Sequence, residues 1–242
     1  MQTEALSISV VVPVKNEAPG FRCLFEDIKR MCEANFSRYE IIIVNDGSTD
    51  GIRELCRSLH PLKYVEFDRN YGQTAALDCG FKLATCDYVA ALDGDGQNVP
   101  GDIPGMVRYL LDNNLDVVCG WRKFRRDNIF RLLLMRLAYF TRQAFLHDGI
   151  HDSGCTLKVF RKETLEGLDL VSGQHRFIPA IMRDRGFKVG EVVVSHKPRK
   201  SGSSKYGSFD RVYHGMLDLY DIKRGHANEH PSSYVVKEVV DF

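Results

Sequence analysis

The sequence predicts an α/β protein in which a mostly parallel central sheet carries helices on both faces. Over the first 120 residues, short apolar runs alternate with stretches whose apolar residues recur at helical spacing. Repeated strand–helix units of this kind are typical of a parallel sheet with helices on both sides. A chain of 242 residues can form one large α/β domain or two small ones.

The expected elements follow one another regularly along the chain. Apolar runs of strand length lie at 8–13, 39–44, 63–67, 88–92 and 116–119. Helical stripes lie at 21–32, 52–59 and 103–111, and small residues at 74–84 suit a further helix. Ser48, Thr49 and Asp50 offer an N-cap for the helix at 52–59.

Composition excludes several classes of protein. Lys and Arg total 33 against 32 for Asp and Glu, so no net charge points to nucleic acid. The seven cysteines form no C-x-x-C pair, which favours reduced thiols in the cytosol. The start lacks the features of a signal peptide, and no run approaches the roughly 20 apolar residues of a membrane span. We therefore expect a cytoplasmic protein with no transmembrane domain.

The most informative segment is DGDGQ at 93–97, directly after the apolar run at 88–92. In extended backbone, Asp93 and Asp95 face the same side, and together they suit a hard divalent cation. Gly94 and Gly96 allow another backbone or a phosphate to approach closely.

Three other interpretations of this segment are open. It could be an ordinary Asp/Gly turn. It could be a calcium loop, although an EF-hand needs Glu where Pro104 stands. It could also hold a phosphatase-type nucleophile at Asp93. The other acids favour a ligand site, because Glu17 and Asp46 also follow predicted strands, and parallel sheets bind ligands at the carboxyl ends of their strands.

The loop after the first strand argues against a dinucleotide-binding oxidoreductase. No G-x-G-x-x-G stands there; residues 13–17 read PVKNE instead.

Three segments together resemble a known family. PVKNE at 13–17, VNDGSTD at 44–50 and DGDGQ at 93–97 have the order and spacing of inverting family-2 glycosyltransferases with the Rossmann-like GT-A fold. Within that group the chain is most similar to dolichyl-phosphate mannosyltransferases and other polyprenyl-phosphate glycosyltransferases. The segments that support this finer likeness are RNYGQ at 69–73, GWR at 120–122, HDSGC at 151–155 and RKSGSSKYG at 199–207. We expect a GT-A domain over 1–225 and a C-terminal tail over 226–242.

The resemblance implies a nucleotide-sugar donor and a divalent cation, Mn²⁺ or Mg²⁺, that neutralises charge on the diphosphate leaving group. Asp95 and Gln97 are the implied metal ligands, and Asp93 would fix the ribose or the water shell of the metal. The other implied donor-binding residues are Pro13, Lys15, Glu17, Val44, Asp46, Gly94, Arg199 and Lys205. Lys15 replaces an aromatic that is common in the family, and Asn45 replaces an aspartate.

Asp95, Arg122 and Asp152 are the implied catalytic residues. Asp152 would orient the acceptor or a sugar hydroxyl, and a structural turn is the alternative role for it. Arg122 and Arg131 are expected at the acceptor phosphate, since arginine can fork onto phosphate oxygens. A phosphomonoester is largely dianionic at neutral pH and needs no strong general base. His147, His151 and His175 are expected to be structural or surface residues.

Two segments of the chain are rich in Lys and Arg, and the first of them suggests contact with a membrane. Residues 122–146 carry seven Lys and Arg among apolar residues, which suits a helix lying in a membrane interface. A helix packed on the core with its arginines in water is the alternative. Residues 198–207 are expected to form a mobile basic loop that orders when the donor binds. Membrane contact would be peripheral, on the cytosolic face, or through a partner subunit.

The sequence therefore predicts an inverting, metal-dependent glycosyltransferase that moves a hexose to polyprenyl or dolichyl phosphate. GDP-mannose is the first donor expected, and a UDP-hexose or UDP-N-acetylhexosamine is the next. A glycan or small-molecule acceptor is an alternative, as is a non-catalytic subunit that binds nucleotide sugars. No nucleic-acid partner is expected, and a homo-oligomer is left open.

Overall fold

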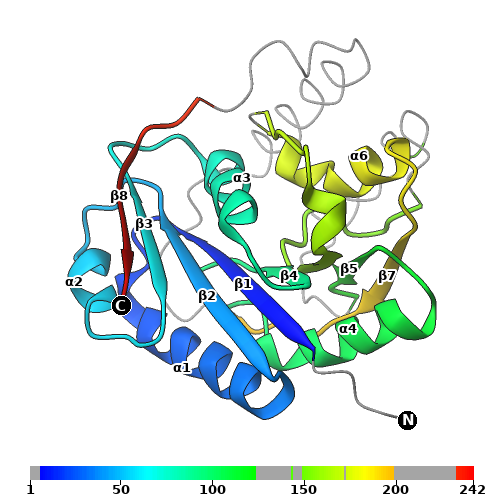
Figure 1. Ribbon diagram of the computed structural model, residues 1–242, viewed down its shortest axis with the longest axis horizontal. Coiled ribbons are helices and arrows are strands. Elements are labelled where there is room, and N and C mark those ends of the chain that lie inside the picture. The colour runs from blue at the N-terminus through cyan, green and yellow to red at the C-terminus, as the bar shows by residue number, and fades with distance from the viewer. Residues whose placement is uncertain (1–5, 124–142, 144–148, 172, 199–232) are drawn as a thin grey trace.

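A computed structural model describes residues 6–123, 143, 149–171, 173–198 and 233–242. Within these residues a single eight-stranded sheet has the order β7-β5-β6-β4-β1-β2-β3-β8 (Figure 1). The strands are β1 (Ser7–Val14), β2 (Arg38–Asn45), β3 (Lys63–Phe67), β4 (Tyr88–Ala91), β5 (Val117–Trp121), β6 (Lys158–Arg161), β7 (Val189–Val193) and β8 (Val236–Asp241).

Helices cover both faces of the sheet, as Figure 1 shows. The α-helices are α1 (Ala18–Asn35), α2 (Ile52–Cys56), α3 (Gln73–Leu83), α4 (Ile103–Asp112) and α6 (Ile178–Asp184). Short 3₁₀ turns are η1 (Pro100–Asp102), η2 (Lys162–Leu165) and η3 (Gln174–Arg176). One apolar cluster lies between the sheet and α1 and α4, and a second lies between the sheet and α3 and α6.

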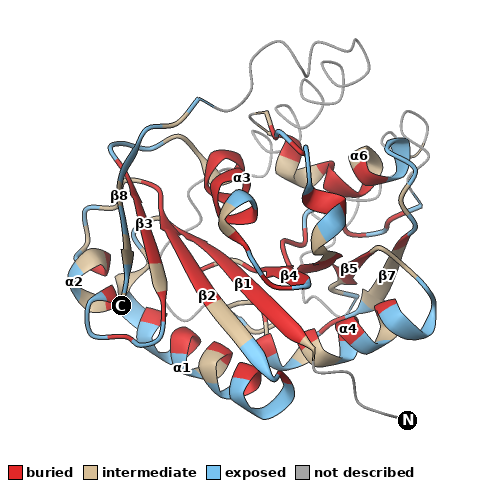
Figure 2. Cartoon of the chain, viewed as in Figure 1, coloured by how far each residue is buried: buried red, intermediate tan, exposed pale blue. Residues whose placement is uncertain are grey.

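The strands at the centre of the sheet are buried on both faces. All eight residues of β1 are buried, as are the last five of β2, and Figure 2 shows this as a continuous band. Burial on both faces explains why these strands appear in the sequence as continuous apolar runs. The α/β prediction with a mostly parallel sheet and helices on both faces is confirmed.

Strand direction changes at two places. β1 pairs in parallel with β2 and β4, and β2 with β3. β6 inserts between β4 and β5 and is antiparallel to both, so β5 still runs in the same direction as β4. Because of this insertion, the segment before β6 lies between the ends of β4 and β5.

The C-terminal segment joins the sheet. The sequence analysis expected a tail over 226–242, yet β8 pairs antiparallel with β3 from Lys63–Asp241 to Phe67–Val236. Phe242 exchanges two backbone hydrogen bonds with Leu62, at 2.8 and 3.0 Å. Val236, Val239 and Val240 therefore belong to an edge strand. No helix in the described part of the chain is long and apolar enough to cross a bilayer.

Candidate active site

The site lies where β4, β1 and β2 end side by side. These three neighbouring strands are parallel, so the segments that follow them meet at one edge of the sheet. The segments are 13–17, 45–50 and 93–97, which the sequence analysis had singled out separately. The tertiary structure thus brings the three together.

Hydrogen bonds join the loop after β1 to the loop after β2. Asn16 accepts the backbone N–H of Thr49 through its side-chain oxygen at 2.8 Å, and its own N–H donates to the Ser48 hydroxyl at 2.9 Å. Asp50 accepts the N–H of Ala18 at 2.7 Å. These side chains therefore hold the two loops together. Gly51, with φ of 80°, occupies the position before α2, and Asp50 accepts the N–H of Ile52, the first residue of α2, at 3.4 Å.

Asp46 is buried beneath the loop that leads into α3. One carboxylate oxygen accepts the N–H of Tyr71 at 2.6 Å and the other accepts the N–H of Gly72 at 3.0 Å. Gly47 has φ of 63°, and a Cβ there would lie 2.6 Å from the carbonyl carbon of Arg69. Asp46 therefore holds this loop in place from the end of β2.

The other residues expected around the donor contribute in different ways. The ammonium of Lys15 donates to the carbonyl oxygens of Asp46 and Gly47, at 2.9 and 2.5 Å. Pro13 pairs in register with Val44, which is fully buried in the core and so supports the site from within the sheet. Glu17 is half-buried and directly precedes α1.

Gly94 allows the acidic segment to pack tightly against the end of β1. A Cβ at Gly94 would lie 2.8 Å from a methyl group of Val14 and 3.0 Å from the carbonyl oxygen of Pro13. This close approach places Asp93 and Asp95 directly beside the 13–17 loop.

Two neutral donors hold the carboxylate of Asp93. The Gln73 amide donates to Oδ1 at 2.6 Å, and the Thr156 hydroxyl donates to Oδ2 at 2.9 Å. Burial raises the pKa of Asp93, and the negative charge of Asp95 raises it further. The hydrogen bond from Thr156 and the positive charges of Arg122 and Lys158 oppose that rise.

Asp95 and Gln97 lie next to the chain that leads into 199–232. Asp95 accepts the N–H of Gln97 at 3.0 Å, and the carbonyl of Gln97 accepts the N–H of Lys197 at 2.9 Å. Asn98 forms a single antiparallel bridge with His196. The basic loop expected over 198–207 therefore starts beside the acidic segment, although Arg199 and Lys205 themselves lie outside the described residues, as does Arg131.

The oxygen donors of this segment fit a divalent cation that shares its ligands with a diphosphate. Within the described ranges, no group of three or more His, Cys, Asp or Glu gathers into a complete metal cage. Mg²⁺ is usually held by one or two carboxylates together with the phosphates of a substrate. Asp93, Asp95 and the side-chain oxygen of Gln97 match that arrangement.

Arg122 and Asp152 form a buried ion pair at the end of β5. Arg122 Nε lies 2.7 Å from Asp152 Oδ2, and its Nη2 lies 2.9 Å from Oδ1. A carboxylate that the sequence analysis expected near the acceptor is therefore bound to the arginine expected at the acceptor phosphate.

Glu191 and Trp121 position the segment around Asp152. Glu191 on β7 accepts the backbone N–H groups of His151 and Asp152, each at 2.9 Å. The His151 ring stacks on Trp121 with the ring centroids 4.3 Å apart, and Lys123 lies 5.1 Å from the Trp121 centroid. A carboxylate from another strand, Glu191 of β7, thus holds the backbone at Asp152.

Four polar residues were not singled out from the sequence: Gln73, Thr156, Lys158 and Glu191. Gln73 ends the segment at 69–73, and Thr156 and Lys158 follow the segment at 151–155. Their proximity to quoted segments was a signal, but their contacts depend on strand order. Glu191 had no local signal, since it lies in the middle of a short strand.

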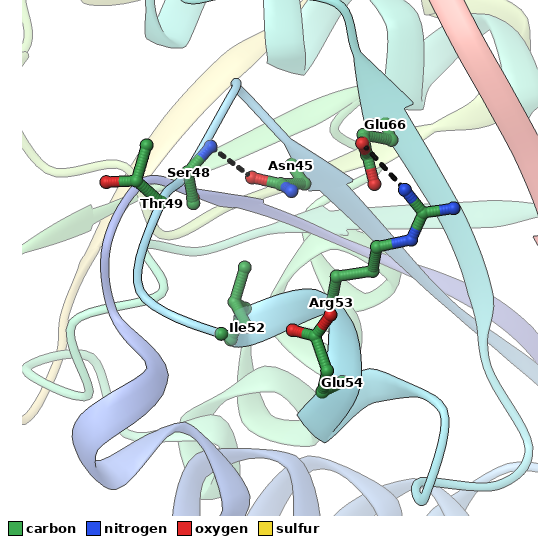
Figure 3. A pocket seen from close by; sticks show the side chains of 8 residues that line it. Asn45, Ser48, Thr49, Ile52, Arg53, Glu54 and Glu66 are labelled. Carbon is green, nitrogen blue, oxygen red and sulfur yellow. Dashed lines mark hydrogen bonds and ion pairs between the residues drawn. The ribbon is translucent and has the colours of Figure 1, made fainter.

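A separate polar pocket opens on the α2 side of the sheet (Figure 3). Its lining residues are Asn45, Ser48, Thr49, Gly51, Ile52, Arg53, Glu54 and Glu66. Arg53 pairs with Glu66 at 3.1 Å and also with Glu238 of β8. Side chains alternate along β2, so Asn45 faces this pocket while Asp46 reaches the loop before α3. The pocket is therefore distinct from the acidic segment.

Comparison with solved structures identifies the class of fold. The chain matches mannosyl-3-phosphoglycerate synthase from Rubrobacter xylanophilus with a TM-score of 0.70 at 14% identity, covering 98% of this chain and 87% of that one. It matches glucosyl-3-phosphoglycerate synthase from Mycobacterium tuberculosis with a TM-score of 0.68 at 18% identity, covering 91% and 80%. The fold is the GT-A fold of glycosyltransferases.

The chain belongs to glycosyl transferase family 2, and residues 9–168 match the sequence pattern of that family. It is 37% identical over 227 residues to a dodecaprenyl-phosphate galacturonate synthase from Rhizobium johnstonii, covering 90% of this chain and 67% of the relative. It is 34% identical to an undecaprenyl-phosphate 4-deoxy-4-formamido-L-arabinose transferase from Aeromonas hydrophila, covering 91% and 68%. The chain spans about two thirds of the length of these relatives. The predictions of the family and of a glycosyltransferase are confirmed.

Proposed function

We propose that this protein transfers a sugar from a nucleotide-sugar donor to a polyprenyl phosphate, with inversion at the anomeric carbon. One observation supports this most strongly: Asp93 and Asp95 lie at the carboxyl edge of β4, beside Asp46 and the loop after β1. The relatives named above carry a polyprenyl phosphate in their own names, which supports the acceptor.

The acidic segment would bind the diphosphate end of the donor. Asp95 and Gln97 would hold a divalent cation, Mn²⁺ or Mg²⁺, and Asp93 would fix the ribose or the water shell of the cation. When bound, the cation supplies positive charge against the leaving diphosphate. Asp46, Lys15, Glu17 and Pro13 would line the base and ribose, and Arg199 and Lys205 would add cations from the following loop.

The Arg122–Asp152 pair would organise the acceptor side. An acceptor phosphate is already nucleophilic at neutral pH, so the protein needs to place it more than to deprotonate it. Asp152 keeps the guanidinium of Arg122 in a defined position at the end of β5, and Arg131 would contribute a second cation. An arginine positioned in this way presents directional donors to phosphate oxygens.

The donor sugar is the least constrained part of the proposal. GDP-mannose was the first expectation, but the relatives named above transfer, by their names, galacturonate and 4-deoxy-4-formamido-L-arabinose. These names favour a donor other than GDP-mannose, and we place a UDP-sugar first. Calorimetric titration of UDP- and GDP-sugars with Mn²⁺ separates the two.

The acceptor implies work at a membrane surface. We propose peripheral attachment to the cytosolic face, through the basic segment at 122–146 or a partner subunit. Flotation with vesicles that contain anionic lipid, compared with neutral vesicles, tests the first route. Transfer to polyprenyl phosphate, compared with soluble glycan acceptors, tests the choice of acceptor.

Substitution of Asp95 tests the whole proposal. Asp95→Ala should abolish metal-dependent transfer and leave the unfolding transition unchanged. Asp112→Asn removes a carboxylate from the exposed end of α4 and is the matched control, which should behave as the unmodified protein. Full transfer by Asp95→Ala would refute the assignment. Donor turnover by the unmodified protein would exclude a non-catalytic subunit.

A further inference from the structure

Asp93 and Asp152 are both held by two side-chain hydrogen bonds, but their partners carry different charges. The oxygens of Asp152 face the guanidinium of Arg122, whose positive charge neutralises the carboxylate. Among the described residues, the side chains that donate hydrogen bonds to the oxygens of Asp93 are the Gln73 amide and the Thr156 hydroxyl, both of which are neutral. Asp93 is thus fixed in space without losing its negative charge to an ion pair.

We propose that Gln73 and Thr156 are positioning residues that set the Asp93 carboxylate for a cation-bound donor. This inference rests on the proposed function, because it assigns a role around the same acidic segment. An ionised carboxylate offers about four lone-pair sites. Two neutral donors occupy one site on each oxygen and leave the others in defined directions, so a bound cation or ribose meets a carboxylate that does not need to reorganise.

The topology explains why these two residues reach Asp93. Gln73 is the first residue of α3, and Thr156 lies two residues before β6. Ala91 of β4 pairs with Lys158 of β6, and paired side chains on adjacent strands share a face. Asp93 and Thr156 each lie two residues from that pair, so the pleat directs both toward the same side of the sheet.

Lys158 adds positive charge near Asp93 without forming an ion pair with it. Its side chain is buried, and its ammonium donates to the carbonyl of Cys155. In the described part of the chain no carboxylate lies within ion-pair distance of it. A buried charge without an ion-pair partner is costly and is common at functional sites. Lys158 therefore adds positive charge near Asp93 while leaving its oxygens to neutral donors.

Thr156→Val tests the inference, because valine keeps the shape of threonine and removes the hydroxyl donor. UDP and GDP are the probes, titrated by calorimetry with and without Mn²⁺. We expect the nucleotide to bind about 10- to 100-fold more weakly in the presence of Mn²⁺, the usual effect of losing a residue that orients a metal ligand. Binding without Mn²⁺ should be unchanged.

Two further variants keep the test decisive. Thr156→Ser retains the hydroxyl and should restore Mn²⁺-dependent binding. Gln73→Met removes the other donor at similar length and should weaken Mn²⁺-dependent binding in the same way, so a Thr156→Val protein that failed to fold would not end the test.

The outcomes separate the inference from the proposed function. If Thr156→Val and Gln73→Met both bind the Mn²⁺–nucleotide as the unmodified protein does, the positioning role is wrong while the proposed function stands. An equal loss with and without Mn²⁺ would also overturn it, since that result indicates a general structural role. If Mn²⁺ fails to strengthen nucleotide binding by the unmodified protein, the proposed function fails with the inference.

Discussion

The guanidinium of Arg122 forks onto the carboxylate of Asp152, with Nε and Nη2 at 2.7 and 2.9 Å from its two oxygens. Both side chains are buried, with 10% and 8% of their surface exposed. Burial alone would lower the pKa of Arg122, but the hydrogen bonds and negative charge of Asp152 outweigh it and raise that pKa. An acceptor phosphate that approaches Arg122 therefore competes with a bound carboxylate.

Breaking this pair on one side should be costly. Asp152→Ala leaves a buried guanidinium without its counter-charge, and we expect a loss of roughly 3–5 kcal/mol in the free energy of unfolding. The double variant Arg122→Met/Asp152→Leu removes both charges and should recover most of that loss. Urea denaturation of the double variant and of the single variants Arg122→Met and Asp152→Leu measures the coupling. Single variants that each cost less than about 1 kcal/mol would show that the pair contributes no more than a surface ion pair.

Substitution of Asp46 should disturb the loop before α3 as well as the donor site. Asp46→Ala leaves the N–H groups of Tyr71 and Gly72 without their acceptor, which should cost roughly 1–3 kcal/mol in the free energy of unfolding. The same change should raise the KM for the donor. Asp68→Asn changes an exposed carboxylate that precedes the same loop and should alter neither quantity. Unchanged stability in Asp46→Ala would show that other contacts hold the loop.

His175 should make the protein less stable at acidic pH. The Thr74 hydroxyl accepts the N–H of Gly173 at 3.1 Å and lies within hydrogen-bond distance of Nδ1 of His175, 2.7 Å away. Burial, and then the charges of Arg176 and Lys158, lower the pKa of His175 to about 3. In the unfolded chain the imidazole of His175 binds a proton near pH 6.5, whereas in the folded chain it stays neutral until about pH 3. The stabilisation is therefore present above pH 6.5 and is lost as the pH falls toward 3.

The measurement is the free energy of unfolding as a function of pH. From pH 6.5 downward, His175 should contribute a loss of up to about 1.4 kcal/mol per pH unit. His175→Gln should show a correspondingly shallower decline between pH 6.5 and 4.5. Equal slopes for the two proteins would mean that the imidazole becomes protonated without unfolding.

Tyr234 should attach the C-terminal segment to α3. Its ring stacks on Phe67 with the centroids 4.9 Å apart, and its hydroxyl donates to buried Asp78 at 3.0 Å. Burial raises the pKa of Tyr234. Tyr234→Ala should lower the free energy of unfolding by roughly 3 kcal/mol, whereas Tyr234→Phe keeps the stack and should lose about 1.5 kcal/mol. Limited proteolysis should release the C-terminus faster in Tyr234→Ala, and an unchanged rate would mean that β8 pairing is sufficient.

Much of the fold could be predicted because its signals are local. The five expected strands occur within two residues of their predicted ends, since each is a short apolar run buried on both faces. The helix expected at 52–59 ends earlier, at Cys56, because hydrogen bonds from Ser58 to Leu55 and from Leu59 to Cys56 close tighter turns in place of the helical pattern. β6, β7 and β8 were missed: charged residues flank or interrupt their apolar positions, and their pairing depends on partners distant in the chain.

The sequence by itself determined the order of the strand–helix units and therefore the edge at which Asp46, Asp93 and Asp95 emerge. It also supplied the residue types that a cation and a diphosphate require. Only the tertiary structure decided which side chains meet. By inserting between β4 and β5, β6 brings Asp152 to Arg122 and Thr156 to Asp93, residues 30 and 63 positions apart in the chain. Hydrophobic periodicity specifies which face of a strand is buried, but partners across strands depend on strand order, which no local pattern encodes.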